Sequence, residues 1–295
     1  MEPTAIELMQ DVPGFDRFIA SWLCPGRRNV LVDVGPANGV DHLIRSLNAL
    51  GVDHIDLVLM THIHIDHAGG LGVFLERFPM ARVICHRKGI GHLVDPSKLW
   101  AGRRKVLGAR AETYGRPRPV PRERLIAHQE ASIEGVDIIE TPGHAPHHLS
   151  FRHGGTLFVG EAGGIYLPLE GMEYLRPATP PVLFLDQFLR SIDRLLDLDD
   201  LPICYTHFAG APRAHPLLRR HREQLIRWEG IIRKERSRPG IRLEERCVER
   251  LLEEDPEIRA FERLSPRTRD RERFFMTNSV RGFLGFLAPG TPQSS

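Results

Sequence analysis

The stretch MTHIHIDHAGG, residues 60–70, constrains what this chain can fold into more than any other segment. It places His62, His64, Asp66 and His67 directly after an apolar run at 55–60, which predicts a buried strand. Polar side chains that are costly to bury therefore crowd the end of one strand. The fold has to offset that cost, and binding of a metal ion is the chemistry that this set of residues favours.

The spacing within the stretch indicates how these side chains can share ions. On an extended chain His62 and His64 point to the same side, because the side-chain period of a strand is two. They can therefore bind one ion. Asp66 continues on that side, and His67 points to the other side, where it can face a second ion. The competing interpretation is a loop of surface histidines, which the position between a strand and a glycine pair disfavours.

A catalytic metal site needs further protein ligands and one open position for water or substrate. Three other predicted strand ends carry suitable residues. His144 follows strand 136–141 in TPGH, Glu161 follows strand 156–160 in VGEAGG, and His207 follows strand 201–206 in YTHF. Each of these residues alone is more often structural, but together they supply what a two-metal site at one sheet edge requires.

The chain resembles the metallo-β-lactamase superfamily in four features that occur in this order. They are THIHIDH, TPGH, a carboxylate after a strand that ends in VG, and a His at the end of a late strand. VLVDVG, which contains Asp33, is similar to an early Asp-containing strand of that family. The resemblance covers about residues 13–210 and implies an α/β fold, an αββα sandwich with the metals at one edge. It implies one metal held by His62, His64 and His144. It implies a second metal held by Asp66, His67 and His207.

Glu161 departs from the family pattern, which usually has an Asp that bridges both metals at this position. Glu is one methylene longer and still offers two oxygens. The sequence leaves three roles open for Glu161: a bridge between the metals, a ligand of one metal, or a side chain that moves aside.

The resemblance implies two divalent metal ions as cofactors, with zinc expected first and iron or manganese as alternatives. Such ions lower the pKa of bound water from 15.7 toward about 7. Asp66 is the candidate catalytic residue as well as a ligand, because its carboxylate can accept a proton from that water. Asp33 is expected either to fix the tautomer of a ligand imidazole or to form a turn.

The pattern of apolar residues divides the chain into two parts. Residues 1–212 alternate strands with helices and form the expected catalytic domain, and residues 213–295 are expected to be a helical C-terminal extension. In this extension one apolar face is expected around Trp228, and another comprises Phe274, Phe275, Phe283, Leu284 and Leu287. The Arg-, Pro- and Gly-rich segment 95–124 predicts a helix and a long surface loop.

Composition limits the partners that we expect. The chain has 295 residues, 41% of them hydrophobic and 26% charged, with a formal net charge of +2. This charge does not favour general attraction to nucleic acid or to an anionic membrane. No apolar run reaches the roughly 18 residues that would span a bilayer, and no secretory signal is visible. The four cysteines are widely spaced without a CxxC. We therefore expect a cytoplasmic protein that acts on a small-molecule substrate, without a membrane or nucleic-acid partner.

Several functions are compatible with this sequence. The first is a metal-dependent hydrolase of a small ester, thioester or lactone, because the helical tail is similar in placement to that of glyoxalase II-like thioesterases. The alternatives are an iron-dependent oxidoreductase similar to persulfide dioxygenases, a nuclease or phosphodiesterase that uses the arginines of 103–124, and a sensor that lost turnover. The oligomeric state is also open.

Overall fold

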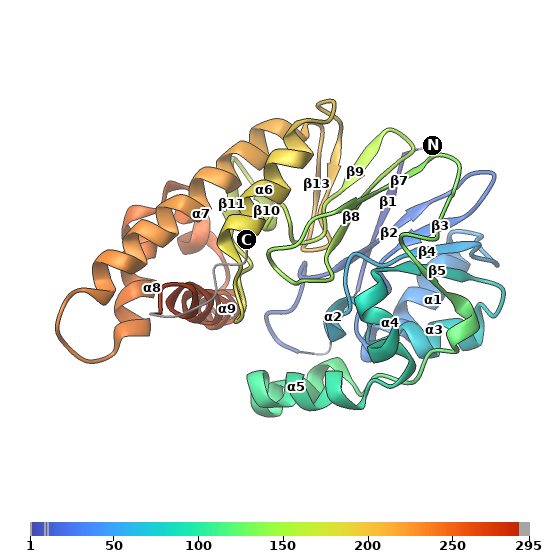
Figure 1. Cartoon of the computed structure of the whole chain (residues 1–295), viewed down its shortest axis with the longest axis horizontal. Helices are drawn as coiled ribbons and strands as arrows, with labels where there is room; N and C mark the ends of the chain where they lie inside the picture. Colours follow the sequence, from blue (N-terminus) through green and yellow to red (C-terminus); the bar gives the residue numbers. More distant parts are fainter. Residues whose placement is uncertain (1, 9, 11, 289–295) are drawn as a thin grey trace.

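The computed structural model describes residues 2–8, 10 and 12–288, with the side chains of 106, 107, 109 and 110 left out. Two β-sheets face each other in the centre, with helices on both outer sides (Figure 1). Helices α1 (Val40–Ala49), α3 (Leu71–Arg77) and α4 (Arg87–Val94) lie on one side. Helices α6 (Leu185–Leu196) and α7 (Ala214–Arg236) lie on the other side.

The first sheet follows the chain in strict order. Its strands are β1 (Thr4–Glu7), β2 (Ala20–Cys24), β3 (Val30–Val32), β4 (Leu57–Leu59), β5 (Arg82–Cys85) and β6 (Leu125–Ala127). The first three strands pair antiparallel, and β3 to β6 pair parallel. The parallel strands are joined through helices, as parallel connections require. Their carboxyl ends therefore meet at one edge of the sheet.

The second sheet has the order β13 (Gly210–Ala211), β12 (Ile203–Cys204), β9 (Thr156–Phe158), β8 (Leu149–His153) and β7 (Val136–Glu140). In this sheet β9 and β12 pair parallel, so the segments that follow them leave at the same edge. A separate hairpin of β10 (Ile165–Leu169) and β11 (Met172–Arg176) connects this sheet to the C-terminal helices. The sequence pattern did not predict this hairpin.

Alternation of side chains along the strands explains the layers. In β3 and β4, Val32 and Leu59 face the inner cluster between the sheets, whereas Leu31 and Val58 face the outer cluster under the helices. On the second sheet, Phe158 faces inward and its neighbour Leu157 packs beneath α6 and α7. Strands buried on both faces need helices on the outside, and this produces the four layers. The predicted αββα sandwich is confirmed.

The C-terminal part consists of α7, α8 (Leu243–Glu254), the 3-10 segment η4 (Pro256–Arg263) and α9 (Pro266–Phe286). Trp228 of α7 lies in the same hydrophobic cluster as Leu157 and Ile203 of the second sheet. The predicted single face of α9 is wrong. Phe274 and Phe275 pack against the first outer cluster, but Phe283, Leu284 and Leu287 belong to or pack against the second. One helix therefore crosses both halves of the sandwich.

Segment 95–124 contains the predicted helix, and its remainder is more ordered than the predicted long loop. Helix α5 (Ser97–Leu107) continues into the 3-10 segment η2 (Gly108–Tyr114), and η3 (Arg122–Arg124) leads into β6. Arg104 pairs with Glu112 within the segment, and Arg118 pairs with Glu76 of α3. Within the described residues, no helix is long and apolar enough to cross a membrane.

Candidate metal centre

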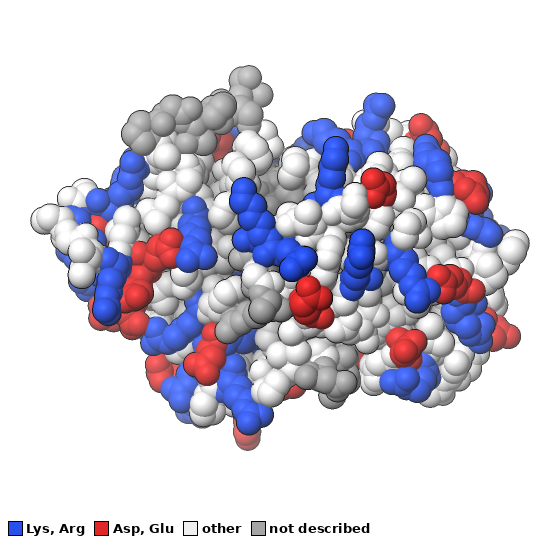
Figure 2. Space-filling model, turned by 90° about the horizontal axis from the view of Figure 1, so that it is seen from below, with Lys and Arg blue, Asp and Glu red and all other residues white. Residues whose placement is uncertain are grey.

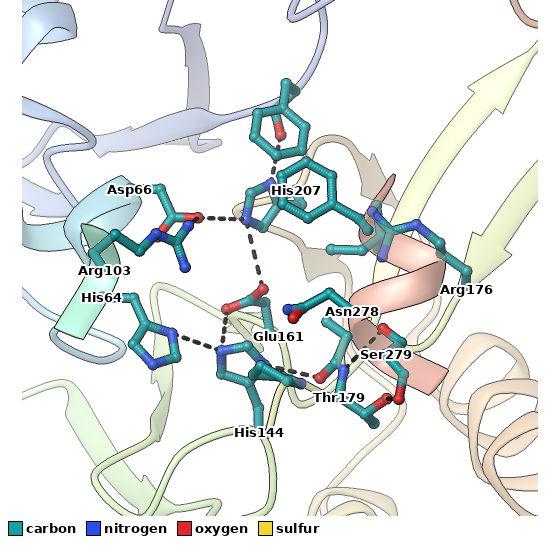
Figure 3. Close-up of a pocket in the computed structure, with 15 residues that line it drawn as sticks. His64, Asp66, Arg103, His144, Glu161, Arg176, Thr179, His207, Asn278 and Ser279 are labelled. Atoms are coloured by element: carbon teal, nitrogen blue, oxygen red, sulfur yellow. Dashed lines mark hydrogen bonds and ion pairs between the residues drawn. The ribbon is translucent and has the colours of Figure 1, made fainter. Parts of the chain in front are cut away.

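Segments that follow four strands converge at one edge of the sandwich. His62 and His64 follow β4, His144 lies in the loop after β7, Glu161 follows β9, and His207 follows β12. Figure 3 shows His64, Asp66, His144, Glu161 and His207 turned toward a common centre. The sandwich therefore brings together side chains that are more than a hundred positions apart in the sequence.

The extended geometry predicted for the histidine run is wrong beyond His64. Residues Ile65–Ala68 form the short helix α2, and the amide of His67 donates to the carbonyl of His64 at 2.9 Å. Strand parity therefore does not place Asp66 and His67. The helical turn carries both of them back toward the centre.

Three imidazoles and one carboxylate form the first group of potential ligands. Nδ1 of His64 lies 2.9 Å from Nε2 of His62 and 2.9 Å from Nε2 of His144. Oε2 of Glu161 lies 3.0 Å from Nε2 of His62 and 2.8 Å from Nε2 of His144. All four ligand atoms lie within 4.8 Å of one another.

Asp66, His67 and His207 form the second group, also within 4.8 Å. Glu161 contacts this group too, because its Oε2 lies 3.3 Å from Nε2 of His67 and its Oε1 lies 3.6 Å from Nε2 of His207. Glu161 is the described carboxylate that reaches both groups. Its extra methylene thus does not carry it away from the centre.

Hydrogen bonds on the far ring nitrogen fix the orientation of the imidazoles. Nδ1 of His144 donates to the carbonyl of Ala178 at 2.8 Å, and Nδ1 of His207 donates to the carbonyl of Phe18 at 2.7 Å. With the proton held at Nδ1, each Nε2 presents its lone pair to the centre. A buried ring that is held in this way is prepared for a metal ion.

Asp33 performs the same task for His67. Its Oδ2 accepts from Nδ1 of His67 at 3.0 Å and from the hydroxyls of Thr61 and Thr206 at 2.7 and 2.9 Å. Its Oδ1 accepts from the amide of Thr61 at 2.8 Å. A residue that only forms a turn would not need these contacts, so Asp33 is a buried support of the centre.

The electrostatics of the centre follow from burial. Burial lowers the pKa of His62 and His64 well below the ordinary value, and lowers that of His207 to about 4, so these rings are neutral. Burial alone would also lower the pKa of His67, but its hydrogen bond to Asp33 and the nearby charge of Glu161 raise it to about 10. For Glu161, burial opposes ionisation, yet His144 and the surrounding imidazoles hold its pKa well below its usual range.

Arg103 of α5 contributes a charge that was not predicted at the centre. Its guanidinium lies 3.2 Å from Oδ2 of Asp66, and its side chain is 15% exposed (Figure 3). Burial would raise the pKa of Asp66, but Arg103 and the neighbouring imidazoles keep it below its ordinary value. Arg103 also stacks over the ring of Tyr114, with 5.2 Å to the centroid.

The residues present fit divalent metal ions. Oδ1 of Asp66, Nε2 of His67 and Oε2 of Glu161 are buried and have no hydrogen-bond partner among the described atoms. Buried polar atoms without partners are costly, and here Asp66 and His67 of α2 gather with Glu161 from the segment after β9. Imidazole and carboxylate donors in this proportion suit zinc, iron and manganese.

A third group, His86, His128 and Glu140, has ligand-like spacing, but its hydrogen bonds argue against metal binding. Nδ1 of His86 accepts from the amide of Lys88, and Nδ1 of His128 accepts from the amide of Arg87. A neutral ring that accepts at Nδ1 carries its proton at Nε2. Nε2 of His128 accordingly donates to Glu140 at 2.8 Å.

The sequence profile of the metallo-beta-lactamase superfamily matches residues 15–207. The chain belongs to this superfamily. The match begins before β2 and ends at His207, so it includes every predicted ligand.

Among relatives, a metallo-beta-lactamase fold-containing protein of Sulfurisphaera tokodaii is 27% identical over 218 residues, 71% of this chain and 78% of that protein. The hydroxyacylglutathione hydrolase of Aeromonas hydrophila is 29% identical over 196 residues, 66% of this chain and 62% of that enzyme. Several further relatives carry the description "probable metallo-hydrolase".

Solved structures extend the likeness to the C-terminal helices. A metallo-beta-lactamase superfamily protein from Sulfolobus tokodaii superposes with a TM-score of 0.68 at 21% identity, over 96% of this chain and 98% of the other. A metallo-beta-lactamase family protein from Thermus thermophilus superposes with a TM-score of 0.66 at 19% identity, over 99% of this chain and 96% of the other. Because both alignments cover nearly the whole chain, helices α7 to α9 are part of a fold shared with these two proteins.

Two further residues, His148 and Gly160, support this metallo-beta-lactamase centre. His148 is buried, and its Nε2 accepts the amide of Glu161 at 3.1 Å while its Nδ1 donates to Thr141 at 2.8 Å. Gly160 has φ +53°, and a Cβ there would lie 2.6 Å from Nε2 of His148. His148 and Gly160 together set the backbone that presents Glu161. The cluster HAPHH was a signal for His148, but nothing marked Arg103 among many arginines.

Proposed function

We propose that this chain is a hydrolase with two divalent metal ions that cleaves a small ester, thioester or lactone. The observation that carries the proposal is the position of Glu161, whose two oxygens contact both ligand groups. That position favours a bridging role for Glu161, with His62, His64 and His144 on one ion and Asp66, His67 and His207 on the other. Zinc is the expected metal.

When bound, two such ions would supply hydroxide at neutral pH and polarise the scissile carbonyl. The residues of the chain then have separate tasks. Asp66 keeps a free Oδ1 in the centre and is the candidate acceptor for the proton of the attacking water. Arg103 holds Asp66 ionised and in position. Phe18, Arg176 and the α9 residues Phe275, Asn278 and Ser279 line the cavity over the centre.

Thioesters are the first substrate class to test, because hydroxyacylglutathione hydrolases are among the relatives. The nuclease alternative has less support. Arg103, Arg104 and Arg118 are each paired with a carboxylate, which reduces the charge available for phosphates. Figure 2 views the molecule from the side on which α5 lies in Figure 1, and Asp and Glu (red) are interspersed there among Lys and Arg (blue).

The test is a panel of thioesters, lactones, esters and phosphodiesters on metal-quantified protein, with and without chelator. We expect about two metal equivalents per chain and chelator-sensitive hydrolysis of a carbonyl substrate. His64→Ala should abolish it, whereas His54→Ala, at an exposed position away from the centre, should not. Iron content together with oxygen consumption would favour the oxidoreductase instead. Less than one metal per chain and no effect of His64→Ala would refute the proposal.

A further inference from the structure

Two cavities of very different size meet beside the metal centre. The cavity over the centre has a volume of about 40 Å³. This exceeds the roughly 10–15 Å³ that one water molecule needs, but it lies far below the volume of about 300 Å³ or more that is typical of a site for a whole small organic ligand. The adjoining cavity has a volume of about 490 Å³, and His64, Arg103 and Pro180 line both. The smaller cavity can admit the reacting carbonyl, so the rest of a substrate has to lie in the larger one.

The wall of the larger cavity is mostly apolar and comes from separate segments. Ile63 and Ile65 flank His64, Leu99 comes from α5, and three prolines come from the loops after β7 and β11: Pro146, Pro180 and Pro181. Proline fixes its own φ, which reduces the number of conformations that these loops can adopt. A volume of this order and an apolar wall are typical of a site for a small organic molecule.

The charged residues that line this cavity are all cationic. Lys88 of α4 and Lys98 of α5 lie at its rim, and Arg103 lies at its junction with the metal centre. Arg103 is paired with Asp66, but neither lysine forms an ion pair with any described residue, and both are exposed. No carboxylate is among the described lining residues.

We propose that the larger cavity binds the body of the substrate and selects an apolar chain that ends in an anionic group, a carboxylate or a phosphate. This inference rests on the proposed function, because it concerns what that metal centre would hydrolyse. The apolar wall supplies affinity without direction, whereas Lys88 and Lys98 discriminate by charge. Lysine suits this role, since its flexible stem can reach either kind of anion.

The chain offers a matched control for this proposal. Its four lysines are Lys88, Lys98, Lys105 and Lys234. Lys105 lies on α5 as Lys98 does, is exposed, and does not line the cavity. The comparison is therefore between K88Q/K98Q and K105Q, which change the same residue type at exposed positions.

The kinetic test uses N-acetylcysteamine thioesters of hexanoate and of adipate, whose acyl chains have equal length and differ in the terminal carboxylate. A thioester of hexanoate with 3-mercaptopropionate places the anion on the thiol instead. In the unmodified protein we expect kcat/KM for an anionic thioester to exceed that for the neutral one about tenfold, in line with close electrostatic complementarity. In K88Q/K98Q the kcat/KM values for the anionic and the neutral thioester should differ by about twofold or less, because KM for the anionic thioester rises. K105Q should keep the original ratio of the two values.

A binding test on the metal-loaded protein removes the dependence on turnover. Calorimetric titration with octanoate, octyl phosphate and octanol compares a carboxylate, a phosphate and a neutral head on one chain. Both anions should bind about tenfold more weakly to K88Q/K98Q than to K105Q, with octanol unchanged. Equal anion binding by the two variants, or a preference for the neutral thioester, would overturn the inference. If no thioester, ester or lactone is hydrolysed but the lysines still select octanoate and octyl phosphate, the proposed function fails and the anion site stands.

Discussion

Oδ2 of Asp33 accepts a hydrogen bond from Nδ1 of His67 at 3.0 Å, and both side chains are completely shielded from solvent. This contact leaves Nε2 of His67 free to face Glu161. Asp33 therefore acts on the metal centre through another residue rather than on the substrate.

Asp33→Asn should weaken metal binding about 10- to 100-fold, the usual effect of losing a carboxylate that orients a ligand imidazole. The amide can still accept one hydrogen bond, but it cannot supply the charge that keeps the His67 ring in position. Titration with a competing chelator measures the affinity. Asp41→Asn, at an exposed position at the start of α1, is the control and should leave affinity unchanged. If Asp33→Asn lowers stability but leaves metal affinity as it was, Asp33 only supports the fold.

Glu161→Asp and Glu161→Gln separate charge from length at the position where this chain departs from its family. Glu161→Gln removes the charge that faces four imidazoles and should reduce metal content to one ion per chain or fewer, with affinity lower by at least about 100-fold. Glu161→Asp keeps the charge and should retain two ions. Metal analysis after dialysis gives the answer, and two ions in Glu161→Gln would exclude a bridging role.

How far the sequence could predict this site depends on what holds each residue. His62, His64, His144, Glu161 and His207 follow strands, and a strand end is visible in an apolar pattern, so their convergence could be anticipated. Asp66 and His67 lie on a helix of four residues, which is too short to leave a periodic signal. The direction of their side chains depends on the hydrogen bond between the amide of His67 and the carbonyl of His64. The pattern of apolar residues does not show this contact.

Arg103 and Phe275 show that a sequence pattern does not predict which tertiary contacts a residue makes. Arg103 is one of several arginines in an Arg-rich segment, and only its tertiary contact with Asp66 distinguishes it. Phe275 was predicted to share a face with Phe283, because both are apolar. The structure assigns them to different clusters, since α9 crosses from one outer layer to the other. Periodicity identifies a buried face but not the surface that buries it.

The pH dependence of stability should reveal His221, a buried histidine of α7 that is not among the predicted ligands. Burial lowers its pKa from 6.5 to about 4, so the unfolded state binds the proton more readily. The neutral His221 ring contributes fully to the free energy of unfolding above pH 6.5, and this contribution is lost as the pH falls toward about 4. At pH 5 the loss amounts to about 2 kcal/mol.

His221→Phe should remove that part of the pH dependence, because Phe has no proton to bind and can pack against Phe188 as the imidazole does. Urea unfolding at pH 7 and pH 5, in the same metal state, measures the free energy difference. His42→Phe, on the half-exposed side of α1, is the control and should follow the unmodified protein. Parallel curves for His221→Phe and His42→Phe would contradict the assignment.

Glu272 of α9 should be essential for attaching the C-terminal helices to the rest of the fold. It is buried, pairs with Arg176 of β11 and with Arg271 at 2.9 Å, and accepts the hydroxyl of Tyr174 at 3.0 Å. Burial opposes its ionisation, but Arg176 and Arg271 lower its pKa to about 2. Glu272→Gln would leave two buried guanidinium groups without a counter-charge and should lower the free energy of unfolding by about 3–5 kcal/mol.

Glu262→Gln is the matched control, because Glu262 pairs with Arg269 at 3.0 Å but is exposed, and its loss should cost less than about 1 kcal/mol. Denaturant unfolding compares the two variants. Arg176, Phe275, Asn278 and Ser279 line the cavity over the metal centre, so Glu272→Gln should also raise KM more than it lowers kcat. An equal and small cost of both substitutions would mean that the buried ion pairs of Glu272 do not hold α9 in place, and the cavity would then keep its shape without them.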